Sequence, residues 1–163
     1  MHKPALTRRG FSIGLLATPF LTVPFLAGSG WAQGALPAMT VTKDPNCGCC
    51  GAWVDYLRQA GFSVDVVETA DIYPIKARLG VPEDLASCHT AEIGGYVIEG
   101  HVPHPAIRKL LSEKPRATGL AVPGMPQSVP GMDVPGATDS YDVILFGAAG
   151  QKRYARYQGR KEI

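Results

Sequence analysis

The chain has 163 residues, which fits one domain of ordinary size, and it carries 16 basic and 14 acidic residues. Three of the bases and none of the acids fall within residues 1–32, so the remainder is nearly neutral, with 13 bases and 14 acids. Those 13 bases form no stripe with interleaved aromatic residues. This composition argues against a nucleic-acid partner.

The first 32 residues have the pattern of a signal peptide. Arg8 and Arg9 precede an apolar run over residues 13–26, and small residues suited to cleavage follow it. The run is shorter than the roughly 20 residues that a membrane span needs, and prolines interrupt it, so a permanent anchor is the weaker alternative. The arginine pair resembles the twin-arginine export signal, with a general secretory signal as the alternative. We predict a twin-arginine signal peptide over 1–32 and a domain over 33–163 that is free of the membrane after cleavage.

The next part of the chain alternates between strand and helix patterns. Period-two runs predict strands, and apolar residues spaced three or four apart predict helices. Gly61 and Gly80 each follow a helical run, where a C-terminal cap is expected. The predicted elements are a strand over 39–43, a helix over 52–60, a strand over 62–67, a helix over 72–79, a strand over 95–100 and a helix over 105–112. The predicted order is βαβαβα.

The C-terminal third changes in composition. Residues 115–136 hold five prolines and four glycines with little periodicity, which predicts a long loop. Residues 141–146 and 151–157 then alternate around a glycine-bounded turn. We predict a long Pro/Gly loop and a C-terminal β-hairpin extension to the α/β domain, with no internal repeat.

Three of the four cysteines crowd one turn of the chain. An even number in an exported protein suggests two structural disulfides, but Cys47, Cys49 and Cys50 are too close together to staple separate regions. A strand, then Cys-x-x-Cys, then a helix is typical of thioredoxin-like proteins. In that fold the loop entering the next apolar strand passes opposite the cysteines. We therefore expect Cys88 and His89, which precede the strand from residue 96, to face the cysteine turn.

This arrangement favours a soft metal. Three thiolates at a helix N-terminus repel one another unless a cation neutralises them, and Cys88 adds a fourth sulfur. Soft sulfur ligands suit Cu(I), zinc and iron–sulfur centres, but the paired zinc motif and the spaced cysteines of iron–sulfur proteins are absent. Met125 and Met132, each in a Pro-Gly-Met segment, are further soft donors or packing residues. The other two histidines, His101 and His104, are either imidazole ligands of a metal or structural or surface groups. We favour the second alternative, because both follow the strand at its far end from Cys88.

Four segments together resemble one family. The segments are Cys47-Gly-Cys-Cys-Gly, Ser87-Cys-His-Thr-Ala, Glu99-Gly-His-Val-Pro and Gly119-Leu-Ala-Val-Pro-Gly-Met-Pro. They are similar to the CopG copper-resistance family of exported bacterial metal-binding proteins. The resemblance implies a thioredoxin-like domain with a C-terminal extension, a periplasmic location and a cysteine-bridged copper cluster. Its implied ligands here are Cys47, Cys49, Cys50 and Cys88, with Met125, Met132 and His89; the sequence departs from the family pattern around residues 127–133.

Three functions follow from these residues. The first is copper binding for resistance or handling, by a monomer that can cycle copper between Cu(I) and Cu(II). Its expected partners are copper ions and other periplasmic copper-handling or redox proteins. The second is a thiol–disulfide oxidoreductase with Cys47 as nucleophile and Cys50 as resolving thiol. The third is a disulfide-stabilised binding module without metal. The first is favoured, because Cys49 and Cys88 have no role in the second and adjacent cysteines suit the third poorly.

Overall fold

A computed structural model describes residues 35–163, and the predicted signal peptide lies outside them. The described residues form one eight-stranded sheet with three α-helices and a short 3-10 helix. This mixed α/β architecture is the class that the sequence predicts. Among residues 35–163, no helix is long and apolar enough to cross a membrane.

Strands alternate with helices from residue 39 to residue 93. The strands are β1 Met39–Lys43, β2 Val64–Glu68, β3 His89–Ile93, β4 Tyr96–Glu99, β5 Gly119–Ala121, β6 Ser140–Gly147, β7 Gly150–Gln158 and β8 Lys161–Glu162. The helices are α1 Gly48–Gln59, α2 Tyr73–Arg78, η1 Glu83–Leu85 and α3 His104–Glu113.

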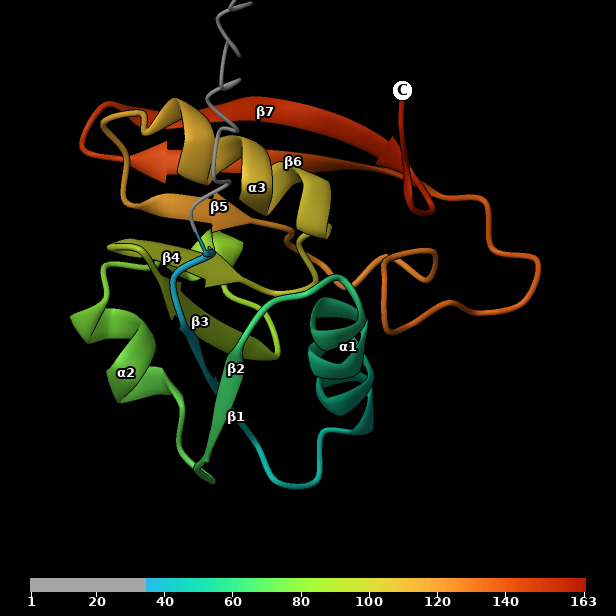
Figure 1. Cartoon of the computed structure of the whole chain (residues 1–163), viewed down its shortest axis with the longest axis horizontal. Coiled ribbons are helices and arrows are strands. Elements are labelled where there is room, and N and C mark those ends of the chain that lie inside the picture. The colour runs from blue at the N-terminus through green and yellow to red at the C-terminus, as the bar shows by residue number, and fades with distance from the viewer. Residues whose placement is uncertain (1–34) are drawn as a thin grey trace, which may run out of the picture. The chain divides into compact units, whose positions relative to one another are not determined.

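The strand order across the sheet is β2-β1-β3-β4-β5-β6-β7-β8 (Figure 1). Helix α1 joins the parallel pair β1 and β2, and α3 joins the parallel pair β4 and β5. The other neighbouring strands are antiparallel. The predicted C-terminal hairpin is confirmed as β6 and β7, which turn between Gly147 and Gly150.

Three strands are missing from the predicted elements: β3, β5 and the two-residue β8 at the C-terminus. Residues 87–90 were expected to be a loop, but β3 begins at His89, so the strand predicted over 95–100 is the second arm of a β3–β4 hairpin. A hydrophobicity pattern does not predict strand β3, because the first two buried residues of the strand are polar, His89 and Thr90. The three-residue β5 lies inside the predicted loop over 115–136.

The core occupies both faces of the sheet, because neighbouring residues of a strand point to opposite sides. On one face, α1 and α3 pack on residues such as Ile98 and Leu120. Helix α1 does so through Trp53, Val54 and Leu57, whose spacing gathers them on one side of the helix. The smaller cluster on the other face is built from Leu85, Val97, Ala121 and Phe146.

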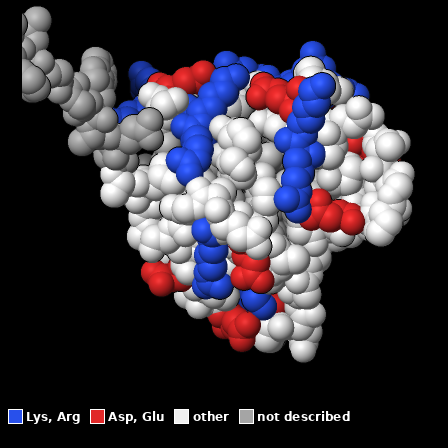
Figure 2. All heavy atoms as spheres, turned by 45° about the vertical axis from the view of Figure 1, so that its right-hand side comes forward, with Lys and Arg blue, Asp and Glu red and all other residues white. Residues whose placement is uncertain are grey.

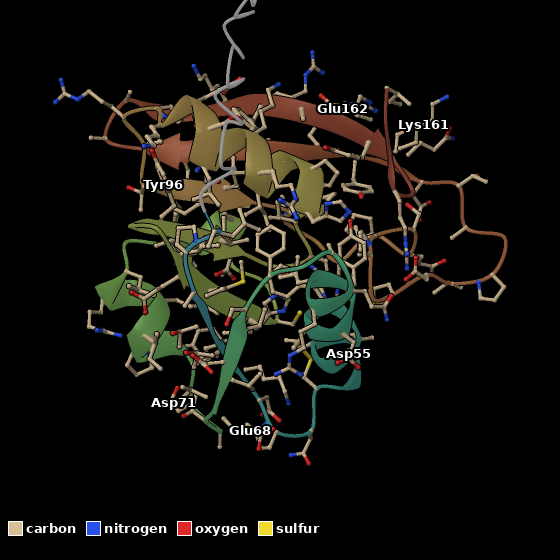
Figure 3. The ribbon with its side chains drawn as sticks, viewed as in Figure 1. Asp55, Glu68, Asp71, Tyr96, Lys161 and Glu162 are labelled. Atoms are coloured by element: carbon tan, nitrogen blue, oxygen red, sulfur yellow. A yellow bond between two sulfur atoms is a disulfide. The ribbon has the colours of Figure 1, made fainter. Side chains whose placement is uncertain are left out.

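The end of β1 is anchored just before the cysteine turn. The nearly buried Lys43 pairs with Glu68 at the end of β2, with 3.0 Å between Nζ and Oε1, and donates to the Asp44 carbonyl at 3.0 Å. Figure 3 shows Glu68 and Asp71 together at this end of the domain, with Tyr96 well away from them. These bonds fix the point at which the chain leaves the sheet for the cysteines.

The C-terminal extension braces the Pro/Gly loop against α1. Arg160, which follows β7, forms an ion pair with Asp133 of the loop at 2.7 Å, and its guanidinium lies 5.0 Å from the centre of the Tyr56 ring of α1. Figure 2 shows Lys and Arg side chains next to Asp and Glu side chains on the face of the molecule that it draws. The loop is therefore held at its C-terminal side as it passes the start of α1.

Candidate metal centre

Three cysteines lie in the first turn of α1. Cys47 is the N-cap residue, and its carbonyl accepts a hydrogen bond from the Gly51 amide at 3.3 Å. The turn before it is closed by Asp44, whose carboxylate accepts from the Asn46 amide at 2.7 Å. The helix begins four residues earlier than the sequence predicts, so Cys49 and Cys50 are helical. Free amides and the positive end of the helix dipole therefore surround these sulfurs.

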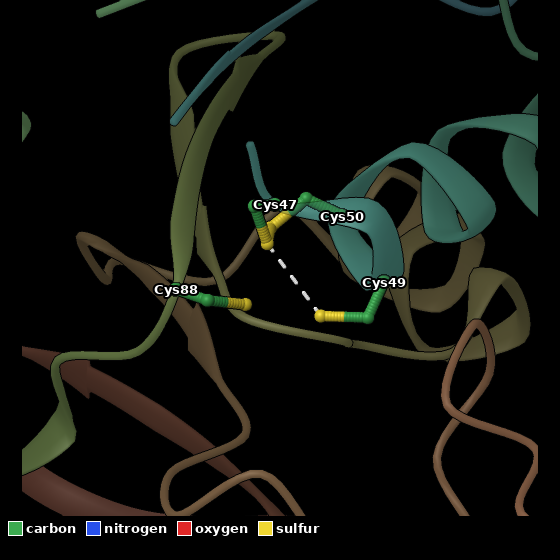
Figure 4. Close-up of side chains that lie close together, drawn as sticks. All are labelled: Cys47, Cys49, Cys50 and Cys88. Carbon is green, nitrogen blue, oxygen red and sulfur yellow. Dashed lines mark hydrogen bonds between the residues drawn. A yellow bond between two sulfur atoms is a disulfide. The ribbon is translucent and has the colours of Figure 1, made fainter. Parts of the chain in front are cut away.

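The four sulfur atoms converge at one point (Figure 4). Cys47 and Cys50 are joined by a disulfide, and Cys49 and Cys88 are free thiols. The Cys49 sulfur lies 3.5 Å from that of Cys47, and all four sulfurs lie within 4.8 Å of one another. Two segments separated by almost forty residues in the sequence thus supply one sulfur cluster.

The β1–β3 register explains why Cys88 faces the cysteine turn. Lys43, the last residue of β1, is paired with His89, the first residue of β3. Cys88 therefore stands beside the point where the chain enters the turn to Cys47. The predicted juxtaposition is confirmed, but β3 produces it, and not a loop leading directly into the strand from residue 96.

Two histidines adjoin the sulfurs. The Cys88 sulfur lies 3.4 Å from Nδ1 of His89 and 3.3 Å from Nε2 of His101. The expected position of His101 is wrong: because β3 and β4 form a hairpin, the chain after β4 returns to the Cys88 end of the sheet. His104 lies elsewhere, with its ring 5.1 Å from that of Tyr56.

Trp53 forms an apolar wall beside the two imidazoles. Its ring centre lies 4.3 Å from that of His89 and 6.4 Å from that of His101. Its Nε1 donates to the Val102 carbonyl at 3.0 Å, so the indole is fixed in place. Trp53 follows Cys50 by three residues, and that helical spacing is the signal by which the sequence could have placed it at the site.

The Pro/Gly loop packs directly on the start of α1. A Cβ atom on Gly131 would lie 2.7 Å from the Trp53 amide nitrogen and 3.0 Å from the Cys49 carbonyl oxygen. The preceding carbonyl, of Pro130, accepts a hydrogen bond from Nδ1 of His101 at 2.7 Å. Met132 follows and packs on the main core, whereas Met125 is a half-buried residue with a left-handed backbone, at φ 49°.

A buried ion pair supports the Cys88 segment from behind. Lys76 of α2 donates to Oε1 of Glu99 at 2.5 Å, and both side chains are almost fully buried. The same Oε1 accepts from the Ser87 amide at 2.5 Å, and Oε2 accepts from the Thr90 hydroxyl at 2.6 Å. The Glu99 carboxylate thus ties together the residues on both sides of Cys88. Sequence reasoning did not identify this network, because Lys76 and Glu99 are 23 residues apart in separate elements.

Burial controls the protonation of these groups. It raises the pKa of the Cys88 thiol to about 11, and the nearby Cys49 adds to that rise. Burial also lowers the pKa of His89 far below its ordinary value, helped by charge on His101 and Lys76, and it lowers the pKa of His101. At neutral pH, the metal-free site therefore presents a protonated Cys88 and neutral imidazoles. A cation bound by the Cys88 sulfur must displace that proton.

The donor set suits a soft or borderline cation. Thiolates favour Cu(I) and zinc, and neutral imidazoles favour copper, zinc, iron and nickel. A second set of donors, from Cys50, Cys88, His89 and His101, also lies within 4.8 Å. In the part of the chain that the structure describes, no carboxylate joins either set, and hard cations such as Mg²⁺ and Ca²⁺ prefer oxygen ligands.

Comparison with known proteins agrees with this chemistry. Residues 85–132 match the family described as "Protein of unknown function, DUF411". Two solved structures, described as copper resistance protein CopG, Form 1 and Form 2, are each 42% identical to this chain with TM-scores of 0.71. The matches cover 76% and 75% of this chain and 99% and 98% of those chains, respectively, whereas no curated protein matches. The chain belongs to the CopG copper-resistance family.

Proposed function

We propose that this protein is an exported copper-binding protein that serves copper resistance, and that it holds several Cu(I) ions through bridging cysteine sulfurs. The observation that carries the proposal is the convergence of four sulfurs from two segments within 4.8 Å. Soft thiolates match Cu(I), and a sulfur can bridge two such ions. The name of the two similar structures supports copper as the cargo.

Copper loading of the whole sulfur cluster requires reduction of the Cys47–Cys50 disulfide. A dithiol reductant supplies two electrons and two protons and becomes a disulfide itself, so the S–S bond breaks and gives two thiols beside Cys49 and Cys88. Binding of Cu(I) then releases the thiol protons and neutralises thiolates that would otherwise repel one another. We propose further that the protein interconverts Cu(I) and Cu(II), with one electron per copper passing to or from a periplasmic redox protein.

Of the other predicted donors, His89 adjoins the sulfur cluster. His89 is fully buried beside Cys88, and Met132 belongs to the segment that packs on the cysteine turn. We assign both residues, together with Met125, as candidate further ligands.

Strand order β2-β1-β3-β4, with α1 after β1 and α3 after β4, supports a thioredoxin-like class for this half of the sheet.

The proposed site of action is the periplasm, where a monomer would exchange copper or electrons with other copper-handling proteins. The support is the twin-arginine pattern at Arg8 and Arg9. We expect the exported protein to begin near Gln33. N-terminal sequencing of protein from the periplasmic fraction tests this, and an intact Met1-containing chain in the membrane fraction would contradict it.

Replacement of Cys88 tests the copper function. Cys88→Ser removes the sulfur that closes the cluster, so copper content and copper-induced thermal stabilisation should both fall, since a ligand that binds only the folded state stabilises it. The matched control is His104→Ala, whose ring lies against Tyr56 away from the sulfurs. A Cys88→Ser protein with full copper content and full stabilisation would remove Cys88 from the site.

A thiol–disulfide oxidoreductase remains the second candidate, because the structure holds a Cys47–Cys50 disulfide at a helix N-terminus. In that function Cys47 attacks the substrate and Cys50 resolves the mixed disulfide, while Cys88 is a bystander. Cys88→Ser would then leave turnover of a disulfide substrate unchanged, and Cys47→Ser would abolish it. Disulfide turnover without copper binding would favour this function over copper handling.

A further inference from the structure

His101 has a defined tautomer that points a lone pair at the Cys88 sulfur. The Pro130 carbonyl can only accept, so the Nδ1 atom that lies 2.7 Å from it carries the proton. In a neutral imidazole, Nε2 then has a free lone pair, and this atom lies 3.3 Å from the Cys88 sulfur. A backbone carbonyl on the outer nitrogen is the usual means by which proteins orient a metal-binding histidine.

His89 presents a second nitrogen to the same sulfur. Its side chain is fully buried, with Nδ1 lying 3.4 Å from the Cys88 sulfur. Its Nε2 has no hydrogen-bond partner among the described residues and is enclosed beside Trp53. Because buried polar atoms are normally paired, an orphaned ring nitrogen needs an explanation. For Nδ1 to bind a cation, the proton of the neutral ring must sit on this Nε2.

The two sulfur–nitrogen distances suit donors that share one metal ion. A cation bound at about 2.0–2.3 Å in trigonal or tetrahedral geometry holds its donor atoms at about 3.4–3.7 Å from one another. The two sulfur–nitrogen distances, 3.3 and 3.4 Å, are close to that separation. Sets of two histidines and one cysteine are typical of copper sites that carry Cu(II) and Cu(I) in turn.

We infer that Cys88, His89 and His101 form a distinct mixed sulfur–nitrogen subsite that binds one Cu(II) ion while Cys47 and Cys50 are disulfide-bonded. This inference rests on the proposed copper function. The disulfide takes two sulfurs out of the thiolate cluster, yet it leaves the set around Cys88 complete. Imidazole nitrogens suit Cu(II) better than an all-sulfur set does. The oxidation state of Cys47 and Cys50 thus decides which donors are available, and with them which copper ion is held.

The test uses the Cys49→Ser protein in its disulfide form, so that Cys88 is the sole thiol and cannot form a second intramolecular disulfide with Cys49. Loading with one equivalent of Cu(II) should give an electron paramagnetic resonance signal coupled to two imidazole nitrogens, identified by ¹⁵N labelling of histidine. His101→Ala in this background should lose one coupled nitrogen and weaken Cu(II) binding by at least tenfold. His104→Ala, the matched control, should change neither property.

A spectrum without two coupled nitrogens in the labelled Cys49→Ser protein would overturn the inference, even if the His101→Ala variant fails to fold. So would a His101→Ala spectrum identical to that of its parent. The Cu(I) content of the fully reduced protein, with Cys49 retained, distinguishes failure of the Cu(II) subsite from failure of the proposed copper function. We expect the fully reduced unsubstituted protein and its His104→Ala variant to bind several Cu(I) ions per chain, whereas loss of all copper binding by the unsubstituted protein would defeat the proposed function itself.

Discussion

Gly131→Ala should disturb the close contact between the Pro/Gly loop and the start of helix α1, which carries the cysteines. The Gly131 φ of +89° carries a cost for any side chain of about 1–2 kcal/mol. A Cβ would also meet the Trp53 amide nitrogen at 2.7 Å and the Cys49 carbonyl at 3.0 Å. These are backbone atoms of a packed helix, so they cannot turn aside, and such overpacking costs about 1–3 kcal/mol. We therefore expect Gly131→Ala to lower the free energy of unfolding by about 2–5 kcal/mol.

Gly136→Ala is the matched control for this substitution. Gly136 lies in the same loop with a φ of +81°, but its Cβ would meet nothing within 4 Å. It should therefore show only the backbone cost, about 1–2 kcal/mol. Urea unfolding of the two metal-free variants, followed by tryptophan fluorescence, measures the difference. Equal losses would refute the close contact between the loop and the cysteine helix.

Three further predictions concern the surroundings of the site. Lys76→Met should lower the free energy of unfolding by about 3–5 kcal/mol, because it leaves the buried Glu99 carboxylate unpaired. Adding Glu99→Gln should recover part of that loss, which a double-mutant cycle measures. Trp53→Phe should cost about 1–3 kcal/mol in urea unfolding, since the buried Val102 carbonyl loses its donor. Burial lowers the pKa of His89, His101 and His104 in the folded state. Below the ordinary histidine pKa of 6.5, the unfolded chain therefore binds more protons than the folded protein. The free energy of unfolding of the metal-free protein should then fall as the pH falls from 6.5. A free energy of unfolding that stays constant from about pH 7 to about pH 5 would contradict the burial of these histidines.

The sequence predicts much of the fold because its strongest local signals are unambiguous. The helix after the cysteines is marked by the spacing of Trp53, Val54 and Leu57, and the C-terminal hairpin by alternation on both sides of a glycine turn. Strand β3 escapes prediction because its buried polar residues serve the site: His89 lies beside the sulfurs and Thr90 donates to Glu99. Strand β5 is too short to show any period.

The missed hairpin also determines what could be predicted of the site. The four cysteines are brought together as expected, because the Cys47 turn and Cys88 both adjoin the paired ends of β1 and β3. His101 was placed at the wrong end, since a single strand carries the chain away from Cys88, whereas a hairpin returns it. The favoured copper hypothesis did not predict the Cys47–Cys50 disulfide, because the spacing of cysteines in a sequence does not show which sulfurs are oxidised.

Copper stoichiometry of the fully reduced protein tests the central claim most directly. The protein is treated with a reductant that opens the Cys47–Cys50 disulfide, loaded anaerobically with Cu(I), freed of excess metal and subjected to elemental analysis alongside a zinc-loaded sample. Four converging sulfurs predict more than one copper per chain, together with loss of all four reactive thiols and a clear preference for copper over zinc. One copper per chain, with zinc bound equally well, would contradict a sulfur-bridged copper cluster.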